Sequence, residues 1–176
     1  MDLSELVNYL KEGKAFPPYS VVLTFDDGYK NNHENLKDII LKYKIPVTIF
    51  LVTDYVGTSE LLWLDKLEMA FFNTTKKKIS SLQSMGIGRI EWHSDEEKME
   101  KYLVLKNYLK KMPHEKLQDA LKSIFNGLIT DEKDMTHVNI NTSYTKLLNW
   151  DDVSELAQCG VRFGSHTSRH EILTAL

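Results

Sequence analysis

The stretch that decides the fold is Val21-Val22-Leu23-Thr24-Phe25-Asp26-Asp27-Gly28-Tyr29. It begins as an apolar run rich in β-branched and aromatic residues, which predicts a strand over residues 20–25. It ends in two adjacent carboxylates and a glycine. Two like charges at the mouth of a core strand repel each other and lose water, and a metal ion beside them relieves that cost. An ordinary Asp-Gly turn explains the same residues, so this stretch alone leaves both interpretations open.

The composition narrows the class of protein. The 176 residues, 42% of them hydrophobic, suffice for one domain with a substantial core. The net charge of −3 gives no reason to expect nucleic acid as a partner, and Lys76-Lys77-Lys78 is predicted to be a solvated loop. The single cysteine, Cys159, excludes an internal disulfide and a cysteine-built zinc site. No apolar run approaches the roughly 20 residues of a transmembrane segment, and no signal peptide is visible, which favours a cytoplasmic protein.

The first third of the chain has the pattern of an α/β fold. Apolar residues at helical spacing predict a helix over residues 3–12. After the strand at 20–25, a second apolar stripe predicts a helix over 32–43, with Asn32 as its N-cap. The near-continuous apolar run at 47–52 then predicts a strand buried on both faces. Strand, helix and strand in this order indicate a βαβ unit with parallel strands.

The section from residue 57 to about 145 is predicted to be a mainly helical insertion. A nearly all-apolar helix is expected at 61–72, and short β-like pieces lie within 73–93. Ser94 begins a capping box before a further helix, Pro113 opens another, and 130–145 is expected to be a loop. The apolar positions predicted for the helix after Ser94 are Met99, Tyr102, Leu103, Leu109 and Met112.

The α/β pattern resumes at Asn149, which is predicted to cap a helix. Asp151 and Asp152 fall in the first turn of this helix, where the helix dipole favours carboxylates, so this second Asp-Asp pair has a structural explanation. A third strand over 161–165 then runs directly into the segment His166-Thr167-Ser168-Arg169-His170.

The two histidines of that segment are candidate metal ligands. His166 and His170 are four residues apart, so a helical turn after Ser165 would put both imidazoles on one face, where they can hold one ion. Such a pair alone also occurs by chance on protein surfaces. Here it follows a strand end, as Asp26-Asp27 does, and the carboxyl ends of parallel strands meet at one rim where active sites collect. The sequence therefore predicts two carboxylates and two imidazoles at the same rim.

These residues resemble the motifs of the polysaccharide deacetylase family, also described as the NodB-homology domain or carbohydrate esterase family 4. Thr24-Phe25-Asp26-Asp27-Gly28 matches the first family motif at every position, and His166 to His170 match the second, His-Ser/Thr-x-x-His. The context Ile45-Pro46-Val47-Thr48-Ile49-Phe50-Leu51 is also similar. The resemblance covers residues 20–54 and 146–176.

The resemblance implies a distorted (β/α) barrel with a metal-dependent hydrolase site at the carboxyl ends of its strands. It implies that Asp27, His166 and His170 are metal ligands and that Asp26 is the catalytic base. Zinc is the expected ion, although a His/His/Asp set accepts other divalent transition metals. The implied reaction removes the N-acetyl group, or a related acyl group, from a carbohydrate substrate.

The chain also departs from the family pattern. It ends just after the second motif, and no residue can be assigned to the third, fourth or fifth motif, which supply an arginine, an orienting group for the base and a histidine general acid. With only three convincing barrel strands, residues 1–176 are expected to be the N-terminal portion of a deacetylase domain, with its core at 17–56 and 146–176 and the insertion at about 57–145. The alternative is a truncated, non-catalytic remnant that binds metal or carbohydrate. The acyl group, the polymer and the oligomeric state stay open.

Other aromatic and imidazole side chains are assigned no chemistry. The tryptophans can stack on sugar rings but are predicted to pack inside the protein, and they are Trp63, Trp92 and Trp150. The histidines outside the second motif are predicted to be surface residues, and they are His33, His93, His114 and His137. Asp54 follows the second strand, a position from which it can reach the rim, and it is assigned no role.

Overall fold

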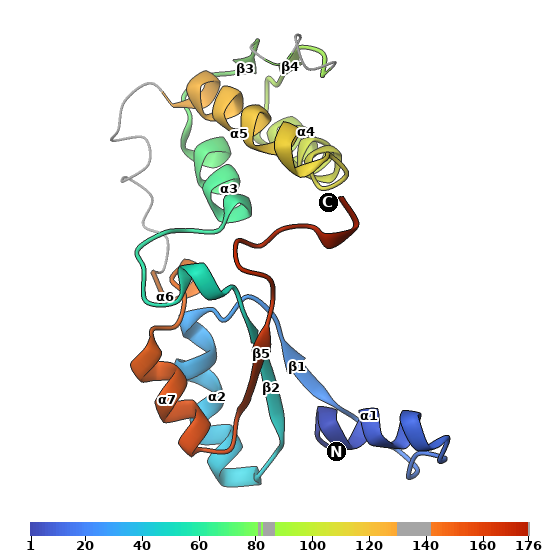
Figure 1. Cartoon of the computed structure of the whole chain (residues 1–176). Helices are drawn as coiled ribbons and strands as arrows, with labels where there is room; N and C mark the ends of the chain where they lie inside the picture. Colours follow the sequence, from blue (N-terminus) through green and yellow to red (C-terminus); the bar gives the residue numbers. More distant parts are fainter. Residues whose placement is uncertain (81, 83–86, 130–141, 176) are drawn as a thin grey trace. The chain divides into compact units, whose positions relative to one another are not determined.

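The computed structural model describes residues 1–80, 82, 87–129 and 142–175 (Figure 1). The chain divides into two compact units, which are described separately below. Residues 1–61 and 141–170 form an α/β unit, and residues 62–140 and 171–176 form a mainly helical unit. Within the described residues, every helix is too short or too polar to cross a membrane.

The α/β unit is built on one parallel sheet with the strand order β1-β2-β5. The strands are β1 (Leu23–Phe25), β2 (Val47–Leu51) and β5 (Arg162–Ser165). Phe25 pairs with Ile49, and Leu51 pairs with Ser165, so the carboxyl ends of all three strands lie at one rim. The predicted α/β class and the parallel pairing are confirmed. The described strands form an open sheet, so the barrel stays a prediction, as does the division into a core and an insertion.

Two helices cover one face of this sheet, α2 (Lys30–Tyr43) and α7 (Trp150–Gln158) (Figure 1). They do so because alternate residues of a strand point to the same face, and β2 presents only apolar side chains to the helices. The buried residues of this core are Ile40, Val47, Ile49, Leu51, Val56, Leu148, Leu156 and Val161. The helix α1 (Leu3–Glu12), confirmed as predicted, has no buried residue and is joined to the sheet through Arg162, which contacts Asp2 and Ser4.

Two predicted boundaries in this unit are wrong. The strand expected at 20–25 is paired only from Leu23, because its partner strand begins at Val47 and offers nothing to the earlier residues. The helix expected at 32–43 starts at Lys30, and Asn32 is a buried residue inside its first turn instead of the N-cap. The earlier start is possible because the N–H of Lys30 donates to the Lys146 carbonyl 2.8 Å away.

The described residues of the helical unit form three long helices and a short hairpin. Their bounds are α3 (Trp63–Asn73), β3 (Lys78–Ile79), β4 (Ile90–Glu91), α4 (Asp95–Leu109) and α5 (His114–Leu128). Its core is centred on Phe71. The centroid of the Phe71 ring lies 5.0 Å from the Trp92 ring centroid and 5.7 Å from the Tyr102 ring centroid. The predicted helices are confirmed, including the start of α5 after Pro113. The capping box predicted at Ser94 is only half formed: the Ser94 side chain accepts from the N–H of Glu97, whereas the Glu97 carboxylate accepts from the N–H of His93 instead of Ser94.

The predicted apolar face of α4 is wrong in part. The buried residues are Lys98, Tyr102, Leu105 and Leu109, whereas Met99 and Leu103 are exposed. The face is displaced because the Lys98 ammonium donates to the carbonyl of Thr74 at 3.2 Å, at the C-terminus of α3. Burial lowers the pKa of Lys98.

Three short helical segments complete the description. They are η1 (Thr53–Tyr55), α6 (Thr142–Thr145) and η4 (Leu173–Ala175). The loop predicted at 130–145 is therefore corrected at its end, where α6 forms, while residues 130–141 lie outside the described part.

Candidate metal centre

The loop after β1 is held in an unusual backbone conformation. Asp27 has φ = 70° and Gly28 has φ = 76°, and the N–H of Gly28 donates back to the Asp26 carbonyl at 2.8 Å. A non-glycine residue with positive φ is strained, and such residues concentrate at functional sites. A Cβ on Gly28 would come within 2.5 Å of Leu51, so this position requires glycine. The turn separates the two carboxylates: Asp26 is exposed, and the Asp27 side chain is only 22% exposed.

A distant segment fixes this loop from the other side. The N–H of Leu148 donates to the carbonyl of Gly28 at 2.8 Å, and Tyr29 forms an antiparallel bridge with Leu147. These backbone contacts hold the chain at the point where α2 starts, immediately after the loop. No local sequence signal predicts them, because they join residues more than a hundred positions apart.

The histidine segment continues the sheet pairing and does not coil. The N–H of His166 donates to the Leu51 carbonyl at 2.7 Å, and the N–H groups of Thr53 and Asp54 donate to the carbonyls of Thr167 and Ser168. The helical turn predicted for this segment is therefore wrong. Thr167 (φ = 66°) and His170 (φ = 60°) also have left-handed backbone conformations.

The structure nevertheless brings three of the predicted residues together. The Nε2 atom of His166 lies 3.4 Å from Asp27 Oδ1, and the Nε2 atom of His170 lies 3.2 Å from the same oxygen. The two imidazole rings are 5.3 Å apart between centroids. The potential ligand atoms of these three residues all lie within 4.8 Å of one another. Their role as metal ligands stays a prediction.

The donor set fits a divalent transition metal. Asp27 Oδ1 is buried and has no hydrogen-bond partner among the described residues, although two imidazole nitrogens face it. A buried carboxylate oxygen without a partner is costly, and a cation beside it removes that cost. Two ligand atoms bound tetrahedrally to zinc lie about 3.3 Å apart, close to the separations found here. One carboxylate and two imidazoles also leave coordination positions for water and substrate, as in catalytic metal sites.

Asp26 stands apart from this group. It is exposed at the same rim, next in sequence to Asp27, and its carboxylate makes no hydrogen bond or ion pair with the described residues. The structure brings together Asp27, His166 and His170, whereas Asp26 adjoins them through the backbone only. Its role as a base stays a prediction.

A network of ion pairs joins α2 and α7 next to the loop that carries Asp27. The Lys30 ammonium, three residues after Asp27, lies 2.5 Å from the buried Asp152 carboxylate. Burial alone raises the pKa of Asp152, but the hydrogen bonds from Lys30 and the Asn149 N–H outweigh it and hold that pKa below its ordinary value. His33 contacts Glu155 at 2.6 Å, so the prediction that His33 is a plain surface residue is wrong. Sequence reasoning missed this network, since only the helix packing brings these charges together.

The other side chains singled out from the sequence have mixed outcomes. His93 is exposed as predicted, while the His114 side chain and His137 lie outside the described part. Trp63 and Trp92 are buried as predicted, but Trp150 is 59% exposed, so the packing prediction for Trp150 is wrong. Asp54 does reach the rim, where its Oδ2 accepts a 3.1 Å hydrogen bond from Arg169.

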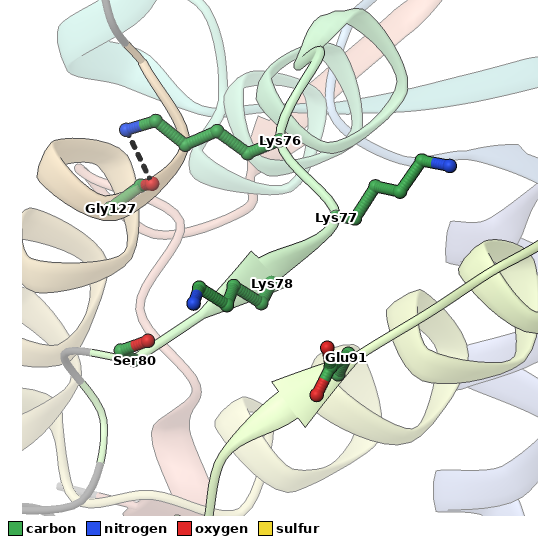
Figure 2. A pocket seen from close by; sticks show the side chains of 6 residues that line it. All are labelled: Lys76, Lys77, Lys78, Ser80, Glu91 and Gly127. Atoms are coloured by element: carbon green, nitrogen blue, oxygen red, sulfur yellow. Dashed lines mark hydrogen bonds between the residues drawn. The ribbon is translucent and has the colours of Figure 1, made fainter.

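The helical unit has a concave surface whose described side chains do not gather around one point, unlike Asp27, His166 and His170. Lys76, Lys77, Lys78, Ser80, Glu91 and Gly127 line a cavity of about 630 Å³. The Lys76 ammonium donates a hydrogen bond to the Gly127 carbonyl at 2.9 Å. Figure 2 shows Lys77 pointing to the opposite side from Lys76. Lys77 and Lys78 are exposed. The exposure of Lys77 and Lys78 agrees with the prediction, but Lys78 begins β3 and Lys76 is half-buried, so the prediction of a solvated loop over all three lysines is wrong in part.

Comparison with known proteins identifies the class. The profile of the family described as "Polysaccharide deacetylase" matches residues 13–176, nearly the whole chain. The chain belongs to the polysaccharide deacetylase family, as its two motifs indicated. No solved structure shows a significant match.

The curated relatives include two staphylococcal enzymes. The chain is 28% identical over 170 residues to a poly-beta-1,6-N-acetyl-D-glucosamine N-deacetylase of Staphylococcus aureus. It is 26% identical over 174 residues to a protein of the same name from Staphylococcus epidermidis. Each match covers 93% of this chain and 53% of the relative, so the chain spans about half the length of these proteins.

Proposed function

We propose that this chain contributes the metal-binding part of a carbohydrate N-deacetylase, which hydrolyses the N-acetyl amide bond of an N-acetylated sugar. The observation that carries the proposal is the meeting of Asp27, His166 and His170 from two distant segments at one rim of the sheet. Membership of the polysaccharide deacetylase family supports the reaction class. The names of the staphylococcal relatives support a polymer of N-acetylglucosamine as the substrate class.

In this proposal Asp27, His166 and His170 hold one divalent ion, with zinc as the first candidate. The unpartnered Asp27 oxygen and the two imidazole nitrogens facing it support this assignment. When bound, the ion supplies Lewis-acid chemistry, which makes water more acidic and an amide carbonyl more electrophilic. The strained backbone at Asp27 and His170 keeps the three side chains directed at one point before any ligand arrives.

Asp26 is the proposed general base. It accepts a proton from the water molecule that attacks the acetyl carbonyl carbon. The C–N bond then breaks with the amine as the leaving group, and the acetyl group is released as acetate. The sugar nitrogen takes up a proton from solvent to become the free amine, because no residue of this chain is assigned as its general acid. The exposure of Asp26 and the absence of a described partner for its carboxylate support this role, because a base must be free to accept a proton.

The proposal is tested by metal binding and amine release with the same protein. The chain is stripped of metal, titrated with Co²⁺ under absorption spectroscopy, and then supplied with Zn²⁺ and oligomers of N-acetylglucosamine. We expect binding of one ion and a slow release of free amines that depends on metal, because no residue of this chain is assigned as the general acid. Asp26→Asn should keep the metal and lower turnover by about 10²–10⁴-fold, the usual contribution of a general base. Asp27→Asn should lose both metal and turnover.

A matched control is Asp38→Asn, which removes an exposed carboxylate from the middle of α2. It should leave metal binding and turnover unchanged. If the unaltered chain binds one ion but releases no amine, the non-catalytic binding role becomes the better assignment. If no ion binds, the metal centre is wrong.

A further inference from the structure

Trp150 differs from the other two tryptophans in its exposure. Trp63 and Trp92 are 9% and 4% exposed, whereas Trp150 is 59% exposed. Tryptophan has the largest apolar side chain, and leaving it in water forgoes a large hydrophobic gain. An exposed tryptophan that is held in one place is therefore a candidate contact for a ligand with an apolar face.

The position of Trp150 places it close to the candidate metal centre. It is the first residue of α7, two positions after Leu148, whose N–H donates to the carbonyl of Gly28 at 2.8 Å. Gly28 directly follows Asp27 in the chain. Two residues of extended chain span at most about 7 Å, so the backbone of Trp150 lies at the same rim as Asp27.

The backbone that carries Trp150 is fixed by its neighbours. Gly57 lies beside the indole: a Cβ built on Gly57 would sit 3.8 Å from the indole Cδ1 atom. The N–H of Gly57 donates to the Leu148 carbonyl at 2.9 Å, which ties the two segments together. The capping box between Asn149 and Asp152 fixes the start of the helix that carries the ring. A contact surface that is fixed in advance loses little entropy when a ligand binds.

We propose that Trp150 is a stacking platform for a pyranose ring of the glycan, at a subsite next to the sugar that loses its acetyl group. This inference rests on the proposed function, because it takes the rim around Asp27 as the place where the substrate binds. The face of a pyranose ring that carries axial C–H groups is apolar and packs flat on an indole. The ligand class is therefore a glycan of at least two N-acetylhexosamine units, one stacked on the indole and the next presenting its acetyl group at the metal centre.

The inference is tested by fluorescence, with the buried tryptophans as internal references. Acrylamide should quench a fraction of the emission that is absent in Trp150→Phe, because Trp63 and Trp92 are buried. Tetramers of N-acetylglucosamine should protect that fraction in the unaltered chain. In Trp150→Ala we expect the affinity for the tetramer to fall about tenfold, the size of a typical aromatic stacking contact, with a smaller loss in Trp150→Phe.

The matched control is Tyr43→Ala, which removes another exposed aromatic residue from the same unit. Tyr43 ends α2, just before β2 begins, and therefore lies at the opposite end of the strands from the rim. This variant should bind the tetramer as the unaltered chain does. An equal loss of affinity in Tyr43→Ala and Trp150→Ala would overturn the platform.

Failure of this inference can be separated from failure of the proposed function. In Asp27→Asn, tetramer protection of Trp150 should persist although metal binding and turnover are lost, which would support the subsite independently. Metal-dependent amine release with an unchanged KM for the tetramer in Trp150→Ala would overturn the subsite and leave the function standing. Quenching of Trp150 that weakens as protein concentration rises, with no effect of the tetramer, would assign the ring to a contact with a second copy and overturn the inference.

Discussion

The helical unit and the α/β unit divide stability and chemistry between them. The helical unit has the larger described core, with Phe71, Leu67 and Ile124 completely buried. The α/β unit has a smaller core on one face of its sheet. All the described non-glycine residues with positive φ lie in the α/β unit, and three of them, Asp27, Thr167 and His170, surround the candidate metal centre. Among the described residues, this conformation is therefore found only in the unit that carries the candidate metal centre, and it is concentrated around that centre, as expected when a site must hold side chains in costly positions.

The largest effect is expected from a cavity in the core of the helical unit. Phe71→Ala removes a ring that packs on Trp92 and Tyr102, and it should lower the free energy of unfolding by about 3–5 kcal/mol. Urea unfolding followed by circular dichroism measures this loss. The neighbouring change Phe72→Ala is the control, because Phe72 is 39% exposed and should cost much less.

The same variant tests how separate the two units are. If stability and chemistry are divided as described, folded Phe71→Ala should bind Co²⁺ with unchanged affinity under native conditions. A parallel loss of metal affinity would break the comparison, because it would show that the helical core supports the metal centre.

The next effect concerns the metal centre itself. His170→Ala removes one of three proposed ligands and should weaken Co²⁺ or Zn²⁺ binding by about 100-fold or more, beyond the 10–100-fold typical of residues that only orient ligands. Competition with a chromophoric chelator measures the change. His170→Asn separates ligand loss from backbone strain, because asparagine tolerates the left-handed conformation found here. Unchanged affinity in both variants would remove His170 from the site, and His93→Ala serves as the exposed-histidine control.

A smaller effect is expected from the ion pair that supports the loop. Asp152→Asn leaves the Lys30 ammonium without its carboxylate and should cost about 2 kcal/mol of unfolding free energy. Because the pKa of Asp152 is lowered in the folded state, its stabilisation is complete above its ordinary value of 3.8 and disappears as the pH falls through the lower folded value. Unfolding measured between neutral and acidic pH should therefore show a weaker acid dependence in Asp152→Asn. An identical pH profile in both proteins would contradict the assignment. Glu155→Gln changes a more exposed carboxylate and should lose less unfolding free energy than Asp152→Asn.

The smallest effect is expected from the exposed ion pair at the rim. Arg169→Ala removes the contact with Asp54, and both side chains are largely exposed, so the unfolding free energy should change by no more than about 0.5 kcal/mol. Thermal unfolding at low and high salt measures it. A large loss of metal affinity in this variant would give the surface pair a role in the chemistry of the α/β unit, because it would show that the rim loop depends on this pair to present His170.

Much of the local structure could be predicted from single segments. The helix at 3–12, the cap at Asn149 and the start of α5 after Pro113 follow from side chains within a few residues, and all three are found. The apolar face of α4 could not be predicted in full. The Lys98 side chain is buried there only because carbonyls at the end of α3 accept its hydrogen bonds, and those carbonyls come from a different helix.

For the site, the sequence by itself determined which residues meet. Asp26-Asp27 and His166/His170 each follow a strand, and parallel strands place such residues at one rim, so the meeting of Asp27, His166 and His170 was predictable. Only the tertiary structure decided how they meet. Pairing of the His166 segment with β2 and η1 prevents the expected helical turn, and the contact of Leu148 with Gly28 brings Trp150 to the rim with its ring exposed. The reason is physical: strand order follows from local pattern, whereas backbone conformation and exposure at the rim depend on hydrogen bonds between segments far apart in the chain.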